Sequence, residues 1–246
     1  MLPDFHKSIT RALSEQPFDF EIVYINDGSS DNTLAIIREL RQADNQVTLV
    51  DLSRNFGKEI ALSAGLQKAA GDAVVVIDAD LQDPPELIPE LIREWQNGYD
   101  VVYAQRSHRK GESLLKRTTA HFFYRIIQRI SKISIPEDTG DFRILSRRAV
   151  NALNTFSEQH RFMKGLFAWI GYKQKAVHYQ RDPRLAGETK WSYWRLWNFA
   201  LDGITSFTIA PLKISTYLGL LTAFGAFMYG IYMLIDTLLY GNPVPG

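Results

Sequence analysis

A short run of β-branched residues followed at once by acidic residues constrains this chain more than any other stretch. Val74 to Ile77 contains only valine and isoleucine, which is typical of a strand buried on both faces inside a parallel sheet. Two carboxylates, Asp78 and Asp80, follow directly. Ligands of open α/β sheets bind at the carboxyl ends of the strands. The run therefore predicts both a central strand and the position of a site.

The spacing of these two carboxylates favours a metal site. Side chains two residues apart face the same way while the chain stays extended, so Asp78 and Asp80 can approach one cation. Mg²⁺ and Mn²⁺ take oxygen ligands and are usually shared between one or two carboxylates and substrate phosphates. We therefore expect a metal–diphosphate site, and the alternative is an ordinary acidic turn.

The residues after the carboxylates predict a helix. Asp83 is a suitable N-cap, and it is followed by proline at the first helical position and by Glu86 three residues after the cap. The helical pattern continues through Leu91 and Trp95 until Asn97-Gly98 stops it.

Strand and helix patterns alternate on the N-terminal side as well. Phe20 to Ile25 and Val47 to Val50 have the composition of strands, and each leads through polar turn residues into a helical pattern. Alternation at this spacing predicts a parallel, doubly wound α/β sheet. Its loops would place a set of polar residues along one rim: Asp27, Asp51, Asn55 and Asp78.

The C-terminal part predicts a membrane span. No residue from Ile214 to Ile235 is formally charged, a run of 22 residues. At about 1.5 Å per residue such a helix is about 33 Å long and can cross a hydrocarbon core of about 30 Å; the alternative is a buried core helix. The stretch from Trp191 to Leu201 carries three tryptophans and predicts an interfacial helix on the membrane, with a soluble core helix as the alternative.

Charge and composition give weaker indications. The net charge of +1 implies no nucleic acid partner, and the lack of cysteine excludes disulfides and thiolate metal sites. Between Arg106 and Arg148, eleven cations stand against four acids, which indicates either a solvated helix face or a membrane-facing surface. Homo-oligomer formation is left open.

Several motifs resemble, in order, those of family 2 glycosyltransferases, over nearly the whole chain. They are Tyr-Ile-Asn-Asp-Gly-Ser-Ser-Asp-Asn-Thr at 24–33, Arg-Asn-Phe-Gly-Lys at 54–58, Asp-Ala-Asp-Leu-Gln-Asp-Pro at 78–84 and Thr-Gly-Asp-Phe-Arg at 139–143. The last of these, with Arg-Leu-Ala-Gly-Glu-Thr-Lys at 184–190, is more specific to the polyprenyl-phosphate branch, which includes bactoprenol glucosyltransferases and dolichol-phosphate mannosyltransferases.

The resemblance implies a GT-A fold, a Rossmann-like, mostly parallel sheet with flanking helices. We expect a catalytic domain over residues 1–185, an interfacial amphipathic helix over 186–211, a transmembrane helix over 212–240 and a tail over 241–246. The implied location is the bacterial inner (cytoplasmic) membrane. Cations before the span, such as Lys213, place the catalytic domain on the cytoplasmic side.

The implied reaction is transfer of a hexose, with glucose preferred, from a nucleotide sugar such as UDP-glucose to undecaprenyl or another polyprenyl phosphate, with inversion and with Mg²⁺ or Mn²⁺. The alternatives are another donor of the GDP-mannose or UDP-aminoarabinose type, a related enzyme with another acceptor, and an inactive membrane-anchored fragment. The fragment alternative arises because Met1 aligns with the helix that follows the family's first strand, and because the chain stops where a second span usually follows. That first strand is expected centrally, between the strands that end at Ile25 and Ile77.

Site residues carried over from the resemblance fall into four groups. The metal ligands are Asp78 and Asp80. The nucleotide-sugar-binding residues are Asp27, Gly28, Asn55, Lys58, Asp78, Arg184 and Lys190. The acceptor-phosphate-binding residues are Arg106, Arg117, His121 and Arg143. The catalytic residues are Asp80 and Asp141; the family assigns Asp141 as a base. However, a phosphate monoester with a second pKa near about 6 is already ionised, so Asp141 is alternatively expected to position the sugar or Arg143.

Overall fold

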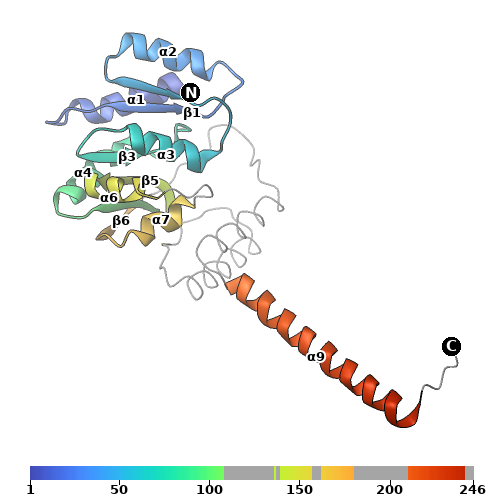
Figure 1. The fold of residues 1–246 in the computed structure, drawn as a ribbon. Helices are drawn as coiled ribbons and strands as arrows, with labels where there is room; N and C mark the ends of the chain where they lie inside the picture. Colours follow the sequence, from blue (N-terminus) through green and yellow to red (C-terminus); the bar gives the residue numbers. More distant parts are fainter. Residues whose placement is uncertain (108–135, 137–138, 157–161, 180–209, 242–246) are drawn as a thin grey trace.

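The computed structural model describes residues 1–107, 136, 139–156, 162–179 and 210–241 (Figure 1). The predicted interfacial helix over 186–211 lies almost entirely outside the described residues. Four predicted site residues also lie outside the described residues: Arg117, His121, Arg184 and Lys190.

The described strands form two sheets. β1 (Ile22–Asn26) pairs in parallel with β2 (Val47–Asp51), with Ile22 opposite Val47. The second sheet has the order β3-β5-β4-β6 and contains β3 (Ala73–Val76), β4 (Val101–Arg106), β5 (Thr139–Ser146) and β6 (Gln174–Tyr179). The predicted strands of the N-terminal half are therefore present.

The strand directions differ from the expected mostly parallel order. β5 runs antiparallel to both of its neighbours, β3 and β4, whereas β4 and β6 are parallel. The sheet is therefore mixed. Hydrophobic periodicity reports which faces of a strand are buried and carries no information about the direction of its neighbours, so this feature could not be read from the pattern.

Helices cover both faces of the four-stranded sheet (Figure 1). Val101 and Val102 are adjacent in β4 and both fully buried, because successive side chains of a strand point to opposite faces. Val102 belongs to the core cluster with α1 (Leu2–Ser14) and α4 (Ile88–Gln96), and Val101 belongs to the cluster with α3 (Lys58–Lys68), α6 (Arg147–Asn154) and α7 (Met163–Trp169). Helix α2 (Thr33–Ala43) packs on β2.

The predicted helix after the acidic turn forms, but it begins later than expected. A 3₁₀ turn over Pro85–Leu87 leads into α4, and no side chain caps either element. Asp83 does not act as an N-cap because its carboxylate accepts a hydrogen bond from the hydroxyl of Tyr179 in β6. The predicted end is confirmed: α4 stops before Asn97, and Gly98 adopts a φ of 91°, a conformation that glycine adopts without a steric penalty.

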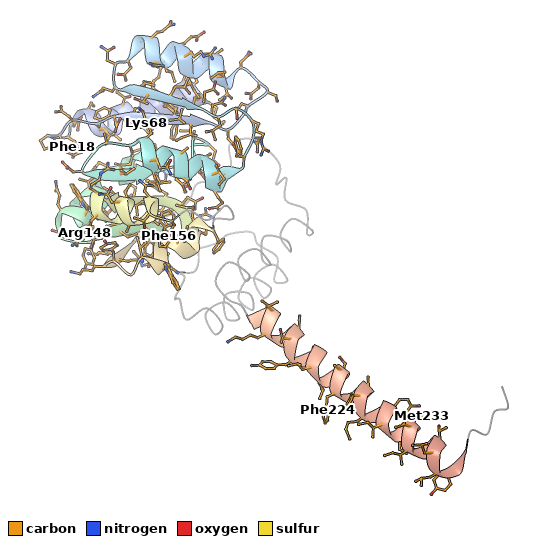
Figure 2. All side chains as sticks on the ribbon, viewed as in Figure 1. Phe18, Lys68, Arg148, Phe156, Phe224 and Met233 are labelled. Carbon is orange, nitrogen blue, oxygen red and sulfur yellow. The ribbon has the colours of Figure 1, made fainter. Side chains whose placement is uncertain are left out.

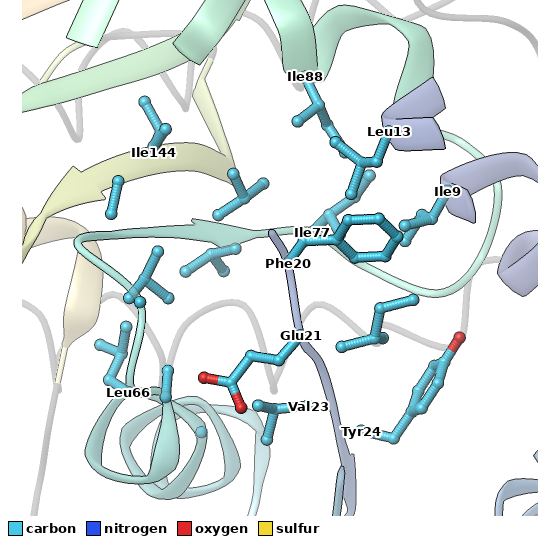
Figure 3. Close-up of a pocket in the computed structure, with 18 of the residues that line it drawn as sticks. Ile9, Leu13, Phe20, Glu21, Val23, Tyr24, Leu66, Ile77, Ile88 and Ile144 are labelled. Carbon is cyan, nitrogen blue, oxygen red and sulfur yellow. The ribbon is translucent and has the colours of Figure 1, made fainter. Parts of the chain in front are cut away.

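A cavity of about 950 Å³ separates β1 from β3 (Figure 3). Side chains from α1, α3 and α4 line it, including Leu13, Leu66 and Ile88, together with both strands. Among the described strands, β1 pairs only with β2 and β3 only with β5, so each presents one unpaired strand edge. Consequently β3 is not buried on both faces as predicted: within it only Val76 is buried. The cavity lies where the resemblance places a further central strand, and that strand stays a prediction.

Helix α9 (Ala210–Tyr240) is 31 residues long. Its segment Leu212–Tyr240 has a mean hydropathy of 1.8 and is, by length and composition, able to cross a membrane. None of its hydrophobic window is buried against the described residues, and large apolar side chains such as Phe224 and Met233 project from it (Figure 2). Within the described part of the chain, α9 is therefore not a buried core helix.

One buried carboxylate ties β4 to α6. Asp100 is 4% exposed, and it accepts hydrogen bonds from the guanidinium of Arg148 (Nη2 to Oδ2, 2.6 Å) and from the hydroxyl of Ser146 (2.8 Å). The hydrogen bonds from Arg148 hold the pKa of Asp100 below its usual value. This carboxyl group therefore stabilises the fold above its unfolded pKa of about 3.9, and the stabilisation is lost as the pH falls through the folded pKa.

We expect Asp100→Asn to lower the free energy of unfolding at pH 7 by about 1 to 3 kcal/mol, because one donor of Arg148 then faces an amide N–H₂ group. The difference from the wild type should shrink below about pH 4. Urea unfolding of the detergent-solubilised chain, followed by tryptophan fluorescence, measures both.

The matched control is Glu90→Gln, which removes the exposed ion pair between Glu90 and Arg93. It should change the stability by less than about 0.5 kcal/mol. An equal effect of the two substitutions would show that Asp100 is not a specific support of the fold.

Candidate functional site

The carboxyl ends of β1 and β2 meet at one rim. The side-chain amide of Asn26, the last residue of β1, donates to the carboxylate of Asp51 at the end of β2 across 2.8 Å. Its amide oxygen accepts from the backbone N–H of Ser29. Asn26 is buried, and these bonds satisfy polar groups that would otherwise be costly to bury. The two loops that follow these strands therefore start side by side.

Asp27 clamps the loop after β1 to the loop after β2. Its carboxylate accepts from the backbone N–H groups of Phe56 (2.7 Å) and Gly57 (2.9 Å). Gly28 lies beneath this contact with a φ of 62°, and a Cβ atom on it would stand 2.4 Å from the backbone nitrogen of Asn55. Only glycine fits there. The two motifs that contain Asp27 and Asn55 are thus packed against each other.

Lys58 connects this loop pair to the end of β3 and to β5. It is the first residue of α3, and its ammonium contacts Asp78 (Nζ to Oδ2, 2.7 Å) and Asp141 (Nζ to Oδ2, 2.6 Å). Burial acts to lower the pKa of Lys58, but the carboxylates of Asp141 and Asp78 outweigh burial and raise it. Lys58, Asp78 and Asp141 were all predicted as site residues, and the structure brings them into direct contact.

The electrostatics of the two carboxylates differ. Burial raises the pKa of Asp78 despite the nearby Lys58. Burial would also raise the pKa of Asp141, but Lys58 and Lys164 outweigh it and hold that pKa below its usual value. Asp141 is only 13% exposed, and it is held as a buried, ionised carboxylate by its cations.

Asp80 does not continue the extended chain that was expected. The strand ends at Val76, and the Asp80 carboxylate accepts from the backbone N–H of Gln82 across 3.0 Å. Leu81, between Asp80 and Gln82, has a φ of 57°, a left-handed conformation that is unfavourable for a branched side chain. Asp80 is still close enough to Asp78 to contribute to raising its pKa.

Arg143 braces the Gly140-Asp141 backbone from behind. It is 4% exposed and donates to the carbonyls of Gly140 (Nη2, 2.9 Å) and Asp141 (Nε, 3.3 Å). Its guanidinium lies 3.8 Å from the centre of the Phe167 ring, and burial lowers its pKa to about 10. Arg143 thereby supports the backbone that carries Asp141, and its contact with the acceptor phosphate stays a prediction.

Arg106 lies near the same backbone. It is the last residue of β4 and donates from Nε to the Tyr179 hydroxyl at 3.5 Å, and that hydroxyl donates to Asp83. A Cβ atom built on Gly140 would be 3.5 Å from Nη2 of Arg106. The guanidinium of Arg106 therefore lies beside Gly140, the residue before Asp141, and its role in binding the acceptor phosphate stays a prediction.

Sequence reasoning missed Lys164 and Glu59. The ammonium of Lys164 in α7 donates to the Thr139 carbonyl (3.1 Å), and burial lowers its pKa while Asp141 opposes that shift. Glu59 accepts from the backbone N–H of Met163 (2.8 Å), and burial raises its pKa. A lysine among the buried apolar residues of α7 was the available signal, because a partly buried cation needs a partner.

A divalent cation fits the chemistry of this site, although its ligands are not assembled as a cage. Asp78 and Asp80 provide carboxylate oxygens, which suit Mg²⁺ or Mn²⁺. Among the described residues, no group of three or more histidine, cysteine or acidic side chains is arranged to hold a metal ion. The ammonium of Lys58 already occupies the space beside the Asp78 carboxylate.

Comparison with known proteins assigns the family. The model of glycosyl transferase family 2 matches residues 2–153. The chain is 51% identical over 238 residues to an uncharacterized glycosyltransferase of Synechocystis, covering 97% of this chain and 75% of that protein. It is 49% identical over 245 residues to the bactoprenol glucosyl transferase of Shigella phage SfV, covering 100% of this chain and 80% of that protein.

A solved structure has the same fold. The mannosyltransferase of Pyrobaculum calidifontis, in complex with GDP-Man and Mn²⁺, superimposes with a TM-score of 0.52 at 15% identity, covering 98% of this chain and 78% of that one. The expected GT-A-like fold is thereby confirmed. With the family's motifs folded around one rim and the family's model matching most of the domain that carries them, the chain belongs to glycosyl transferase family 2.

Proposed function

We propose that this chain transfers glucose from UDP-glucose to a polyprenyl phosphate, undecaprenyl phosphate in bacteria, with inversion at the anomeric carbon. The observation that carries the proposal is the 49% identity over 245 residues to proteins named bactoprenol glucosyl transferase. These relatives match this chain over its full length. Their names supply the sugar and the lipid, and the nucleotide follows from the family resemblance.

A divalent metal, Mg²⁺ or Mn²⁺, is part of the proposal. Asp78 and the Asp80 carboxylate oxygen that does not accept from Gln82 would hold it. When bound, the ion would neutralise charge on the departing nucleoside diphosphate. Support comes from the mannosyltransferase of similar fold, which was solved with GDP-Man and Mn²⁺.

The remaining residues divide between donor and acceptor. Asp27 and Gly28 belong to the loop after β1, which would hold the nucleotide, and the Lys58 ammonium would bind the diphosphate. Arg106 and Arg143 would bind the acceptor phosphate, because a guanidinium can bind a phosphate through two parallel hydrogen bonds. Arg117 and His121 remain predictions for the acceptor, as do Arg184 and Lys190 for closure over the donor.

Asp141 is better suited to positioning than to removing a proton. Its pKa is held below the usual value by Lys58 and Lys164, and a general base is most effective when its pKa lies near the working pH. The acceptor phosphate is also largely ionised at neutral pH, since its second pKa is near about 6. Asp141 would instead hold Lys58 and align the sugar.

Asp141→Asn should therefore retain measurable transfer, lowered by up to about a hundredfold through misplacement of the reactants. Its kcat should vary with pH between 6.5 and 9 no more than that of the wild type. If the kcat of this variant instead recovers steeply at high pH, Asp141 acts as a base and the positioning role is wrong.

The donor and acceptor are tested with the detergent-solubilised chain, undecaprenyl phosphate and radiolabelled UDP-glucose. We expect a glucosylated lipid to form with Mg²⁺ or Mn²⁺ and not with EDTA, and Asp80→Asn to lose this metal-dependent turnover. Equal amounts of GDP-mannose or UDP-aminoarabinose serve as competing donors. Preferential use of either would overturn the glucose assignment, and a lack of Mg²⁺-dependent UDP binding would favour the inactive fragment.

We also propose that α9 anchors the chain in the bacterial inner membrane with the catalytic domain in the cytoplasm. The chain contains no cysteine, so single cysteines introduced at the exposed positions Ser14 and Tyr240 can be labelled without background. In spheroplasts treated with an impermeant maleimide, Tyr240→Cys should be labelled, and Ser14→Cys only after lysis. The reverse pattern would contradict the orientation.

A further inference from the structure

The ammonium of Lys58 lies between two carboxylates, one that follows β3 and one in β5. Its distances of 2.7 Å to Asp78 and 2.6 Å to Asp141 are those of charge-assisted hydrogen bonds. Asp78 is also a predicted metal ligand. In the donor-free protein, Oδ2 of Asp78 is therefore already paired with the ammonium of Lys58.

We propose that Lys58 is a resident counter-ion that suppresses metal binding until the donor arrives. In the free protein its ammonium competes with a divalent cation for Asp78. The diphosphate of the donor offers the ammonium another anion and releases Asp78 to the metal. Metal and nucleotide then bind cooperatively. This inference rests on the proposed function for its donor and its metal.

The charges around the site support weak metal binding without a donor. Asp78, Asp80 and Asp141 attract a cation, and Glu59 adds a fourth acidic group. Among the described residues, four cations counter them: Lys58, Lys164, Arg143 and Arg106. The opposing charges nearly cancel, so the attraction for a divalent cation is small until a diphosphate adds negative charge.

The position of Lys58 in its helix is not explained by helix stability. A cation in the first turn opposes the helix dipole, and the backbone of this turn is already held because Asp27 binds the N–H groups of Phe56 and Gly57. The Lys58 side chain is 53% exposed and has a flexible four-carbon stem. The ammonium is therefore able to move from Asp78 to a ligand while the backbone stays in place.

The alternative is a static ion pair that only joins α3 to β3 and β5. In that case, removal of the ammonium would let the two carboxylates repel each other and move apart, and metal affinity would fall or stay unchanged. The two possibilities predict opposite signs for the same measurement.

The test measures the affinity for Mn²⁺ alone by electron paramagnetic resonance of the free ion, with the full chain in detergent. Lys58→Met should bind Mn²⁺ about tenfold or more tightly than the wild type without nucleotide, within the roughly 5- to 150-fold range of typical couplings between sites. Addition of UDP should strengthen Mn²⁺ binding strongly in the wild type and much less in the variant. Unchanged or weaker Mn²⁺ affinity in Lys58→Met overturns the inference.

Two further variants and one control complete the design. Lys58→Gln keeps hydrogen-bond donors without charge and should gain Mn²⁺ affinity as Lys58→Met does, which covers a failure of the methionine variant to fold. Lys58→Arg keeps the charge and should bind Mn²⁺ as weakly as the wild type. Lys68→Met, at the exposed end of the same helix, should change nothing. A gain in Lys68→Met equal to that in Lys58→Met would overturn the inference.

The result also separates this inference from the proposed function. If the neutral variants gain Mn²⁺ affinity but the wild type shows no response to UDP, the lysine competes with the metal as inferred and the proposed donor is wrong. If UDP strengthens Mn²⁺ binding equally in the wild type and in both neutral variants, the donor proposal is supported and the role of Lys58 is refuted.

Discussion

An ammonium shared by two carboxylates holds together the segments of this chain that carry its chemistry. Lys58 begins α3, Asp78 follows β3 and Asp141 lies in β5. Asp141 is only 13% exposed, and a carboxylate in such a position is costly without a partner. Lys58 and Asp78 are 53% and 36% exposed, so their contact is weaker and can be exchanged for another.

Hydrogen bonds to the backbone hold the two segments that carry Lys58 and Asp141. Asp27 holds the loop that ends at Lys58, and Gly28 permits the backbone of that loop to approach β1 closely. Arg143 does the same for the Gly140-Asp141 backbone on the opposite side. The charged ends of these side chains can therefore move while the backbone that carries them is held in place. Such an arrangement suits a site in which cations and anions exchange partners without a change of fold.

The local parts of the fold followed from the sequence, and the pairing of distant parts did not. β1, β2 and the helix that stops before Asn97-Gly98 were predictable because their signals, periodicity and turn residues, lie within a few neighbouring residues. The antiparallel direction of β5 and the burial of Arg143 depend on which segments meet in space. The predicted N-cap at Asp83 failed for the same reason, since Tyr179, nearly a hundred residues later, binds that carboxylate.

The sequence by itself determined the family, the α/β class and the apolar C-terminal helix, and it predicted Asp78, Asp141 and Lys58 as site residues. Only the tertiary structure decided that Lys58 joins these two carboxylates and that Lys164 stands beside Asp141. The physical reason is that residue type and spacing specify which charges a chain carries. The pKa of each group, and the partner it neutralises, depend on burial and on distances between segments that are remote in the sequence.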